Sequence, residues 1–270
     1  MTSKNIYQSI YQQQIYLNSG LADIYLNGSK KSNVVFFFQE LLKHDKGCIE
    51  MRISLVNAQF PVSWYLINTT NNVFFFNGLR IDFPVGNYNV STFTTQFNSL
   101  LPNTSITYNN KTNIFTINST GNFVLSDGDN SIFSIMGFVK GTSYSSASNA
   151  LAAPFPFNFS GLTRVNVKSP SFNIRNIDSF NKGRSKTIQT IPVNANQNGV
   201  IQYVNYTNFK TVFKTKDMTS IQIEICDDFH NLVDFQNIDW TICLQVDIFS
   251  EIIEDLETLA DVYDKVINSK

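Results

Sequence analysis

Residues 48–60 read CIEMRISLVNAQF and carry a clear alternation of apolar and polar side chains. One side of this pattern holds Ile49, Met51, Ile53, Leu55 and, at the next position of the register, Asn57; the other side holds Glu50, Arg52 and Ser54. Successive side chains of a β-strand point to opposite faces of its sheet. The stretch therefore predicts a strand with one face turned to the core.

Shorter strand-like runs continue on both sides of this stretch, and turn residues separate them. About a dozen such runs are found along the chain, with no alternation of strands and long helices. They include Val34 to Phe38, Val73 to Phe76, Ile106 to Tyr108, Ile114 to Ile117, Ile132 to Phe138, Leu162 to Val167, Thr187 to Val193, Val200 to Tyr206, Phe209 to Phe213, Ile221 to Cys226 and Trp240 to Phe249. This pattern predicts an all-β fold, a single jelly-roll antiparallel sandwich.

Two helices are expected within this β-rich chain. The first begins at Ser91 as N-cap, places Phe93 and Phe97 on one face, and stops at Pro102. The second is a C-terminal amphipathic, acidic helix over residues 250–270. Its apolar residues recur every three or four positions, at Phe249, Ile252, Leu256, Leu259, Tyr263 and Val266.

The remaining organisation follows from where the patterns begin and end. Residues 1–32 scatter tyrosines among Gln, Asn and Ser without a sustained period, so they are expected to form an extended N-terminal arm. Residues 33–249 are expected to form the jelly-roll domain, and residues 250–270 the acidic helix.

The composition excludes several classes of protein. Charged residues make up 15% of the chain against the usual quarter or so, and 33 asparagines stand among many other uncharged polar residues. A net charge of -1 provides no basic footprint for direct nucleic-acid binding. The apolar runs are too short to span a membrane. Cys48, Cys226 and Cys243 lie in strand-like runs without CxxC spacing, which indicates core residues in a reducing compartment.

No group of residues assembles into a convincing catalytic or metal site. Asp227 to Asn231 includes His230, and Asp127 to Asn130 is rich in carboxylates, but both are typical of turns. Ser179 and Lys182 match S-x-x-K only by spacing. Residues 182–186 form a basic cluster that is typical of a solvated loop, with a contact for a phosphate or an acidic partner as the alternative. We therefore expect no enzyme activity, no catalytic, cofactor-binding or metal-binding residues, and no cofactor.

The order of the motifs resembles one family. The motifs are residues 34–38 (VVFFF), 53–68 (ISLVNAQFPVSWYLIN), 83–89 (FPVGNYN), 135–138 (IMGF), 191–193 (IPV), 200–203 (VIQY), 221–227 (IQIEICD) and 239–242 (DWTI). Together they are similar to the penton proteins, the single jelly-roll minor capsid proteins of virophages, Polinton-like viruses and related large DNA viruses. The resemblance covers residues 33–249 and brings no catalytic residue with it.

This resemblance implies a structural role in a virion. It implies a homopentamer that closes the five-fold vertices of an icosahedral capsid and contacts the major capsid protein around the vertex. Assembly would take place in the reducing cytoplasm or virus factory of the infected cell. Two alternatives remain: a β-sandwich carbohydrate-binding or host-attachment protein, and a glycan hydrolase, which would need paired carboxylates in a cleft.

The apolar seam of the expected C-terminal helix must be covered. Three covers remain: the sandwich of the same chain, a bundle of sister helices about the five-fold axis, or another capsid protein. The bundle is disfavoured because it would bring about thirty carboxylates together with few lysines.

Overall fold

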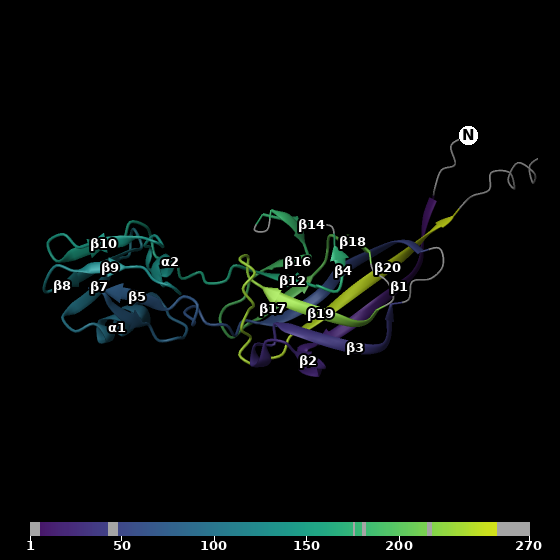
Figure 1. Cartoon of the computed structure of the whole chain (residues 1–270), viewed down its shortest axis with the longest axis horizontal. Coiled ribbons are helices and arrows are strands. Elements are labelled where there is room, and N and C mark those ends of the chain that lie inside the picture. Colours follow the sequence, from purple (N-terminus) through teal and green to yellow (C-terminus); the bar gives the residue numbers. More distant parts are fainter. Residues whose placement is uncertain (1–5, 43–47, 175, 180–181, 215–217, 253–270) are drawn as a thin grey trace, which may run out of the picture. The chain divides into compact units, whose positions relative to one another are not determined.

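A computed structural model describes residues 6–42, 48–174, 176–179, 182–214 and 218–252. The chain divides into two compact units. The first, which we call the sandwich unit, is built from Met1–Ser63 and Arg164–Lys270; the second, the inserted unit, is Trp64–Thr163. Figure 1 shows the elements of both along the chain. The expected domain at 33–249 is therefore interrupted by a separate unit with its own core.

The sandwich unit consists of two antiparallel sheets (Figure 1). The first sheet contains β1 (Ile6–Asn18), β20 (Thr241–Ile252), β4 (Cys48–Pro61), β18 (Thr211–Lys214) and β13 (Asn173–Ile174), with β17 (Val200–Val204) also paired to β4. The second contains β16 (Thr187–Pro192), β12 (Arg164–Lys168), β19 (Met218–Cys226), β3 (Asn33–Leu42) and β2 (Ile24–Tyr25). Smaller elements are η1 (Ser19–Leu21), η2 (Gly28–Lys30) and the hairpin of β14 (Asn176–Asp178) and β15 (Gly183–Ser185).

The strand order confirms the predicted all-β jelly roll. One sheet runs β1, β20, β4 and then β17 or β18, while the other runs β3, β19, β12 and β16. The chain passes from one sheet to the other between most successive strands, so strands that are neighbours in space are far apart in sequence. If β17 and β18, which both pair with β4, are taken as one position, and β2 and β13 as additional edge strands, the two layers have the eight strand positions of a jelly roll. The inserted unit occupies the connection between β4 and β12.

The core of the sandwich unit follows the alternation seen in the sequence. Met51, Ile53 and Leu55 of β4 are buried. A register shift between β4 and β20 at Leu55 and Asn57 then adds one residue to β4. A bulge of this kind reverses which side chains face inward. Ala58 is consequently buried, and Asn57 is exposed where the simple alternation places it on the apolar side.

The expected N-terminal arm is instead part of this core. β1 pairs with β20 along its whole length, from Ile6 opposite Ile252 to Asn18 opposite Thr241. Ile15 and Leu17 are buried while Gln14 and Tyr16 are exposed, which is the alternation of a strand with one buried face. Gln12, Gln14 and Tyr16 occupy outward positions, while the half-buried Tyr11 and Gln13 lie on the side of Ile15 and Leu17. Polar residues on both sides concealed the period of two.

The inserted unit contains two sheets and two helices (Figure 1). Its strands are β5 (Val73–Phe76), β6 (Leu79–Asp82), β9 (Val124–Ser126) and β10 (Ser143–Ser145) in one sheet, and β7 (Thr104–Asn109), β8 (Ile114–Ser119) and β11 (Ala150–Ala152) in the other; its helices are α1 (Val90–Leu100) and α2 (Phe133–Met136).

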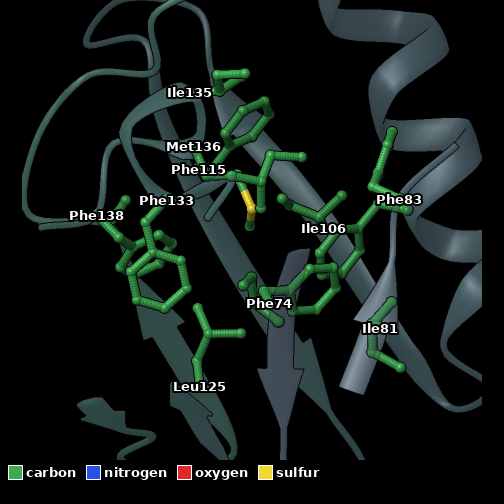
Figure 2. Close-up of a cluster of buried hydrophobic side chains, with 14 of the residues drawn as sticks. Phe74, Ile81, Phe83, Ile106, Phe115, Leu125, Phe133, Ile135, Met136 and Phe138 are labelled. Atoms are coloured by element: carbon green, nitrogen blue, oxygen red, sulfur yellow. The ribbon is translucent and has the colours of Figure 1, made fainter. Parts of the chain in front are cut away.

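Phenylalanine fills the core of the inserted unit, and Figure 2 shows Phe74, Phe115 and Phe133 within this cluster. The ring of Phe93, on α1, stacks on Phe83 with centroids 4.7 Å apart and on Phe115 with centroids 5.3 Å apart. Aromatic pairs at such separations contribute beyond the area they bury. The cluster gives this unit a hydrophobic core of its own.

Both helices of the inserted unit differ in detail from the sequence prediction. α1 is capped by Asn89, two residues before Ser91: the Asn89 side chain accepts from the Thr92 N–H at 2.9 Å, and Thr92 Oγ1 accepts from the Asn89 N–H at 3.0 Å. Residues 133–136 form a helical turn where a strand was expected over Ile132 to Phe138. Gly137 ends this turn in the left-handed region at φ 85°.

The expected C-terminal helix begins where the structure still shows a strand. β20 continues to Ile252, so residues 250–252 are extended. The rest of the expected helix, residues 253–270, lies outside the described residues.

Candidate functional site

The turn at residues 227–231 is held by its own hydrogen bonds. Oδ1 of Asp227 accepts from the backbone N–H groups of Phe229 and Asn231, each at 2.8 Å, and its Oδ2 accepts from the Asn231 side chain at 2.9 Å. Asp228 accepts from Arg164 Nε at 2.6 Å. His230 adopts a positive φ of 65° within the turn. Both carboxylates therefore serve to order the turn and fix it to β12.

The acidic turn at residues 127–130 has a similar structural character. One carboxylate oxygen of Asp127 accepts from the Gly141 N–H. Its Oδ1 is buried and makes no hydrogen bond to a described residue. Within the part of the chain that the structure describes, no group of three or more His, Cys, Asp and Glu side chains is close enough to hold a metal ion.

The histidine, basic and cysteine candidates from the sequence do not form a common site among the described residues. His44 lies outside the described residues. Lys182 and Arg184 are exposed on the β14–β15 hairpin. Cys226 and Cys243 are buried free thiols, and burial raises the pKa of both, that of Cys226 to about 11. A thiol held in its neutral form is a poor nucleophile, so these cysteines act as small core residues.

An open pocket of about 500 Å³ lies where β14, β15 and β16 meet the β17–β18 loop. We call it the edge pocket, because β16 and β17 each end their sheet on this side. Its wall includes Asn176 and Ile177 of the hairpin, Ile188 and Thr190 of β16, and Phe209 of the loop. Two apolar side chains stay in contact with solvent here: Ile177 is 79% exposed and Phe209 is 48% exposed.

Polar contacts fix both sides of the edge pocket. The side chain of Asn176 donates to the Thr187 carbonyl at 2.9 Å, which ties the hairpin to β16. On the other side, Asn205 accepts from the Phe209 N–H at 3.1 Å and donates to the Phe209 carbonyl at 2.9 Å. The exposed apolar side chains are thus held on an ordered frame.

A buried ion pair anchors the same loop to the sheet. Lys210 Nζ lies 2.6 Å from Asp247 Oδ2, and the Asp247 side chain is 1% exposed. Gln245 Nε2 donates to the other carboxylate oxygen at 2.8 Å. Because Lys210 follows Phe209 directly, the ion pair fixes the loop beside the edge pocket. The sequence shows no signal for this contact, since 37 residues separate the partners.

A second exposed apolar surface lies on residues 21–26, which we call the N-terminal loop surface. Leu21, Ile24, Tyr25 and Leu26 are all exposed there. The backbone under them is ordered: the Leu26 N–H donates to the Asn33 carbonyl at 2.9 Å and the Tyr25 hydroxyl to the Ser19 carbonyl at 2.8 Å. An apolar group of this kind on an ordered backbone is typical of an interaction surface.

None of the helices in the described ranges combines the length and the apolar character that a membrane span requires.

Comparisons with known proteins relate the chain to solved structures only. No protein-family model matches the sequence. No curated protein matches it either. Among solved structures, the chain is similar to the penton protein of mavirus, crystallised with selenomethionine, with a TM-score of 0.46 and 11% sequence identity. The match covers 89% of this chain and 100% of that one.

Proposed function

We propose that this chain is a structural capsid protein that forms homopentamers and closes the five-fold vertices of an icosahedral virion. The observation that carries the proposal is the complete eight-stranded jelly roll, built in the order β1, β20, β4, β17/β18 and β3, β19, β12, β16. Viral capsid domains, lectins and cupins share this architecture. The order of sequence motifs over residues 33–249 favours the capsid role among them.

The described surface supports an assembling protein. The N-terminal loop surface presents Leu21 and Leu26 to solvent on an ordered backbone. In the proposed pentamer such apolar groups are covered by a neighbouring subunit or by a capsomer of the major capsid protein. The uncharged polar composition suits broad contacts of this kind, each burying on the order of 1,600 Å² in total.

The carboxylates of the sandwich unit do not favour the glycan hydrolase alternative. A glycosidase needs two carboxyl groups facing the scissile bond across a cleft. Asp227 and Asp228 are adjacent but are engaged in a turn and with Arg164. Asp247 is paired with Lys210 inside the protein.

Native mass spectrometry of the purified full-length chain tests the proposal. We expect a pentamer that dissociates as the concentration falls. Leu21→Asp should shift the population toward monomer, whereas Leu79→Asp, at an exposed site of the inserted unit, should leave it unchanged. A stable dimer or trimer would contradict a vertex protein. A monomer that binds an immobilised glycan would favour the carbohydrate-binding alternative instead.

A further inference from the structure

The first sheet of the sandwich unit has an open edge at β1. On its other side β1 pairs with β20, and one position beyond this ladder the Ser19 N–H donates to the Trp240 carbonyl at 3.0 Å. Hydrogen-bonded positions alternate along an antiparallel pair. The backbone groups of Gln14 and Tyr16 therefore point away from β20, where no backbone group of another described residue bonds to them.

β17 forms a second open edge of the same sheet, since among the described strands it pairs with β4 alone. Just outside β17, the Val62 N–H donates to the Gly199 carbonyl and the Asn205 N–H to the Val56 carbonyl, each at 2.9 Å. By the same alternation, these two bonds turn every second residue of β17 away from β4. The residues turned away are Val200, Gln202 and Val204.

Neither edge carries the features that normally keep sheet edges apart. Proteins protect such strands with charged side chains, with proline or with short length. β1 has 13 residues and β17 has five, and neither contains a charged residue or a proline. The second sheet, by contrast, ends in β2, which has two residues, and in β16, which contains Pro192. The two open edges of the first sheet are thus suited to pairing with another strand.

The exposed side chains beside the two edges match each other. Antiparallel pairing with Gln14 opposite Gln202 places Tyr16 opposite Val200. Tyr16 is 72% exposed and Val200 is 50% exposed, and both glutamines are exposed as well. A tyrosine opposite a valine is a stabilising cross-strand pair, and two glutamine amides can exchange hydrogen bonds.

The two edges cannot meet within one chain. β20 and β4 lie between β1 and β17 in the same sheet, so the edges are three strand spacings apart, about 14 Å. Two different surfaces on opposite sides of one subunit are what a head-to-tail contact requires, and such contacts close into rings. The partner that fits both edges is therefore a second copy of this chain.

We propose that β1 of one copy pairs antiparallel with β17 of the next copy, so that the first sheet continues from subunit to subunit. Leu21, which is 78% exposed three residues after β1, extends the same contact. The inference rests on the proposed pentamer and names the two surfaces through which its neighbouring subunits meet.

Photo-crosslinking of the full-length chain tests the edge pairing. A benzoylphenylalanine in place of Tyr16 should, on irradiation, capture peptides that contain residues 200–206, in products of dimer mass or larger. The same group in place of Tyr108, which is 45% exposed in the inserted unit, should not capture these peptides. Denaturing gels give the mass of the products, and peptide mass spectrometry identifies the captured segment.

Proline variants test whether backbone hydrogen bonds carry the contact. Gln14→Pro removes an N–H that β20 does not use, so the subunit should still fold, as a thermal melt can show. We expect the concentration for half-dissociation of the pentamer to rise at least about tenfold over that of Gln14→Ala, which keeps the N–H. Gln202→Pro should have the same effect from the opposite edge.

The outcomes separate the edge pairing from the pentamer itself. A pentamer in which position 16 does not capture residues 200–206, or one that resists both proline variants, would overturn the edge pairing and leave the capsid role standing. The expected crosslink in open filaments, or in rings of another size, would support the edge pairing and contradict the pentamer. A chain that stays monomeric and forms no crosslink would contradict both.

Discussion

Asp247 shows how a single buried charge organises the β17–β18 loop. Its two carboxylate oxygens accept from Lys210 and Gln245, and 1% of the side chain is exposed. Removing one partner of such a pair leaves the other charge buried without compensation. Lys210→Met should therefore lower the free energy of unfolding by about 3 kcal/mol, measured by urea denaturation.

Arg80 offers the matched control for this substitution. Its ion pair with Asp82 has nearly the same length, 2.7 Å, but more than half of each side chain is exposed. Solvent screens such a pair, so Arg80→Met should leave the stability almost unchanged. Equal losses from the two variants would show that the Lys210–Asp247 pair has no special structural role.

The buried thiols make a separate prediction about reactivity. Burial raises the pKa of Cys226 to about 11 and also raises that of Cys243. Thiolates are the reactive form, so iodoacetamide at pH 8 should label neither cysteine in the folded chain and both in urea. The sign of the pH effect follows: an unfolded thiol ionises near pH 8.5 to 9, so stability should fall as pH rises from there toward 11. Rapid native labelling of Cys226 would contradict its burial.

At the scale of elements, β1 distinguishes a core strand from an assembly arm. Leu17 is buried against the sandwich and Gln14 is exposed on the same strand. Leu17→Ala should cost about 3 kcal/mol, whereas Gln14→Ala should be nearly neutral. Thermal melts of the two full-length variants provide the measurement. Unchanged melting temperatures for both variants would mean that this segment is an assembly arm and not a core strand.

The sequence predicted elements well where the apolar period is dense. β4, β19 and β20 alternate over many residues, and α1 has phenylalanines at helical spacing. β1 was missed because its outward positions carry Gln and Tyr, which hide an alternation carried by Ile15 and Leu17. The turn at Phe133–Met136 was missed because a short apolar run suits a strand or a helix equally. Its ending depends on Gly137, where a Cβ would lie 2.1 Å from the Phe155 carbonyl oxygen.

The edge pocket was beyond sequence prediction for a different reason. Ile177, Thr190 and Phe209 each lie in ordinary strand or turn segments, and only the jelly-roll connections bring them together. The basic cluster at 182–186 was visible in the sequence, but the sequence did not show that Ser185 of this cluster and Phe209 line the same pocket. The pairing of strands that are distant in sequence therefore creates the edge pocket, and no local sequence motif predicts it.

At the scale of the whole molecule, the chain has two separate hydrophobic cores. Phe93 is fully buried in the inserted unit and Phe60 in the sandwich unit. Phe93→Ala should remove about 4 kcal/mol from the inserted unit, and Phe60→Ala a similar amount from the sandwich unit. In calorimetry we expect two unfolding transitions, one for each unit. Each variant should lower the transition temperature of the unit that carries the substitution and leave the other unchanged. A single transition lowered by both would mean that the units unfold together.

The position of β20 has a consequence for how the protein is made. β1 and β4 are among the first strands to leave the ribosome, yet both pair with β20, the last strand that the structure describes. The first sheet cannot close until β20 has been synthesised, because β20 lies between β1 and β4 and joins them. Contacts this distant in sequence form slowly. The inserted unit is synthesised well before β20 and can fold during translation, so the nascent chain carries a folded domain while β1 and β4 still lack the strand that pairs with both.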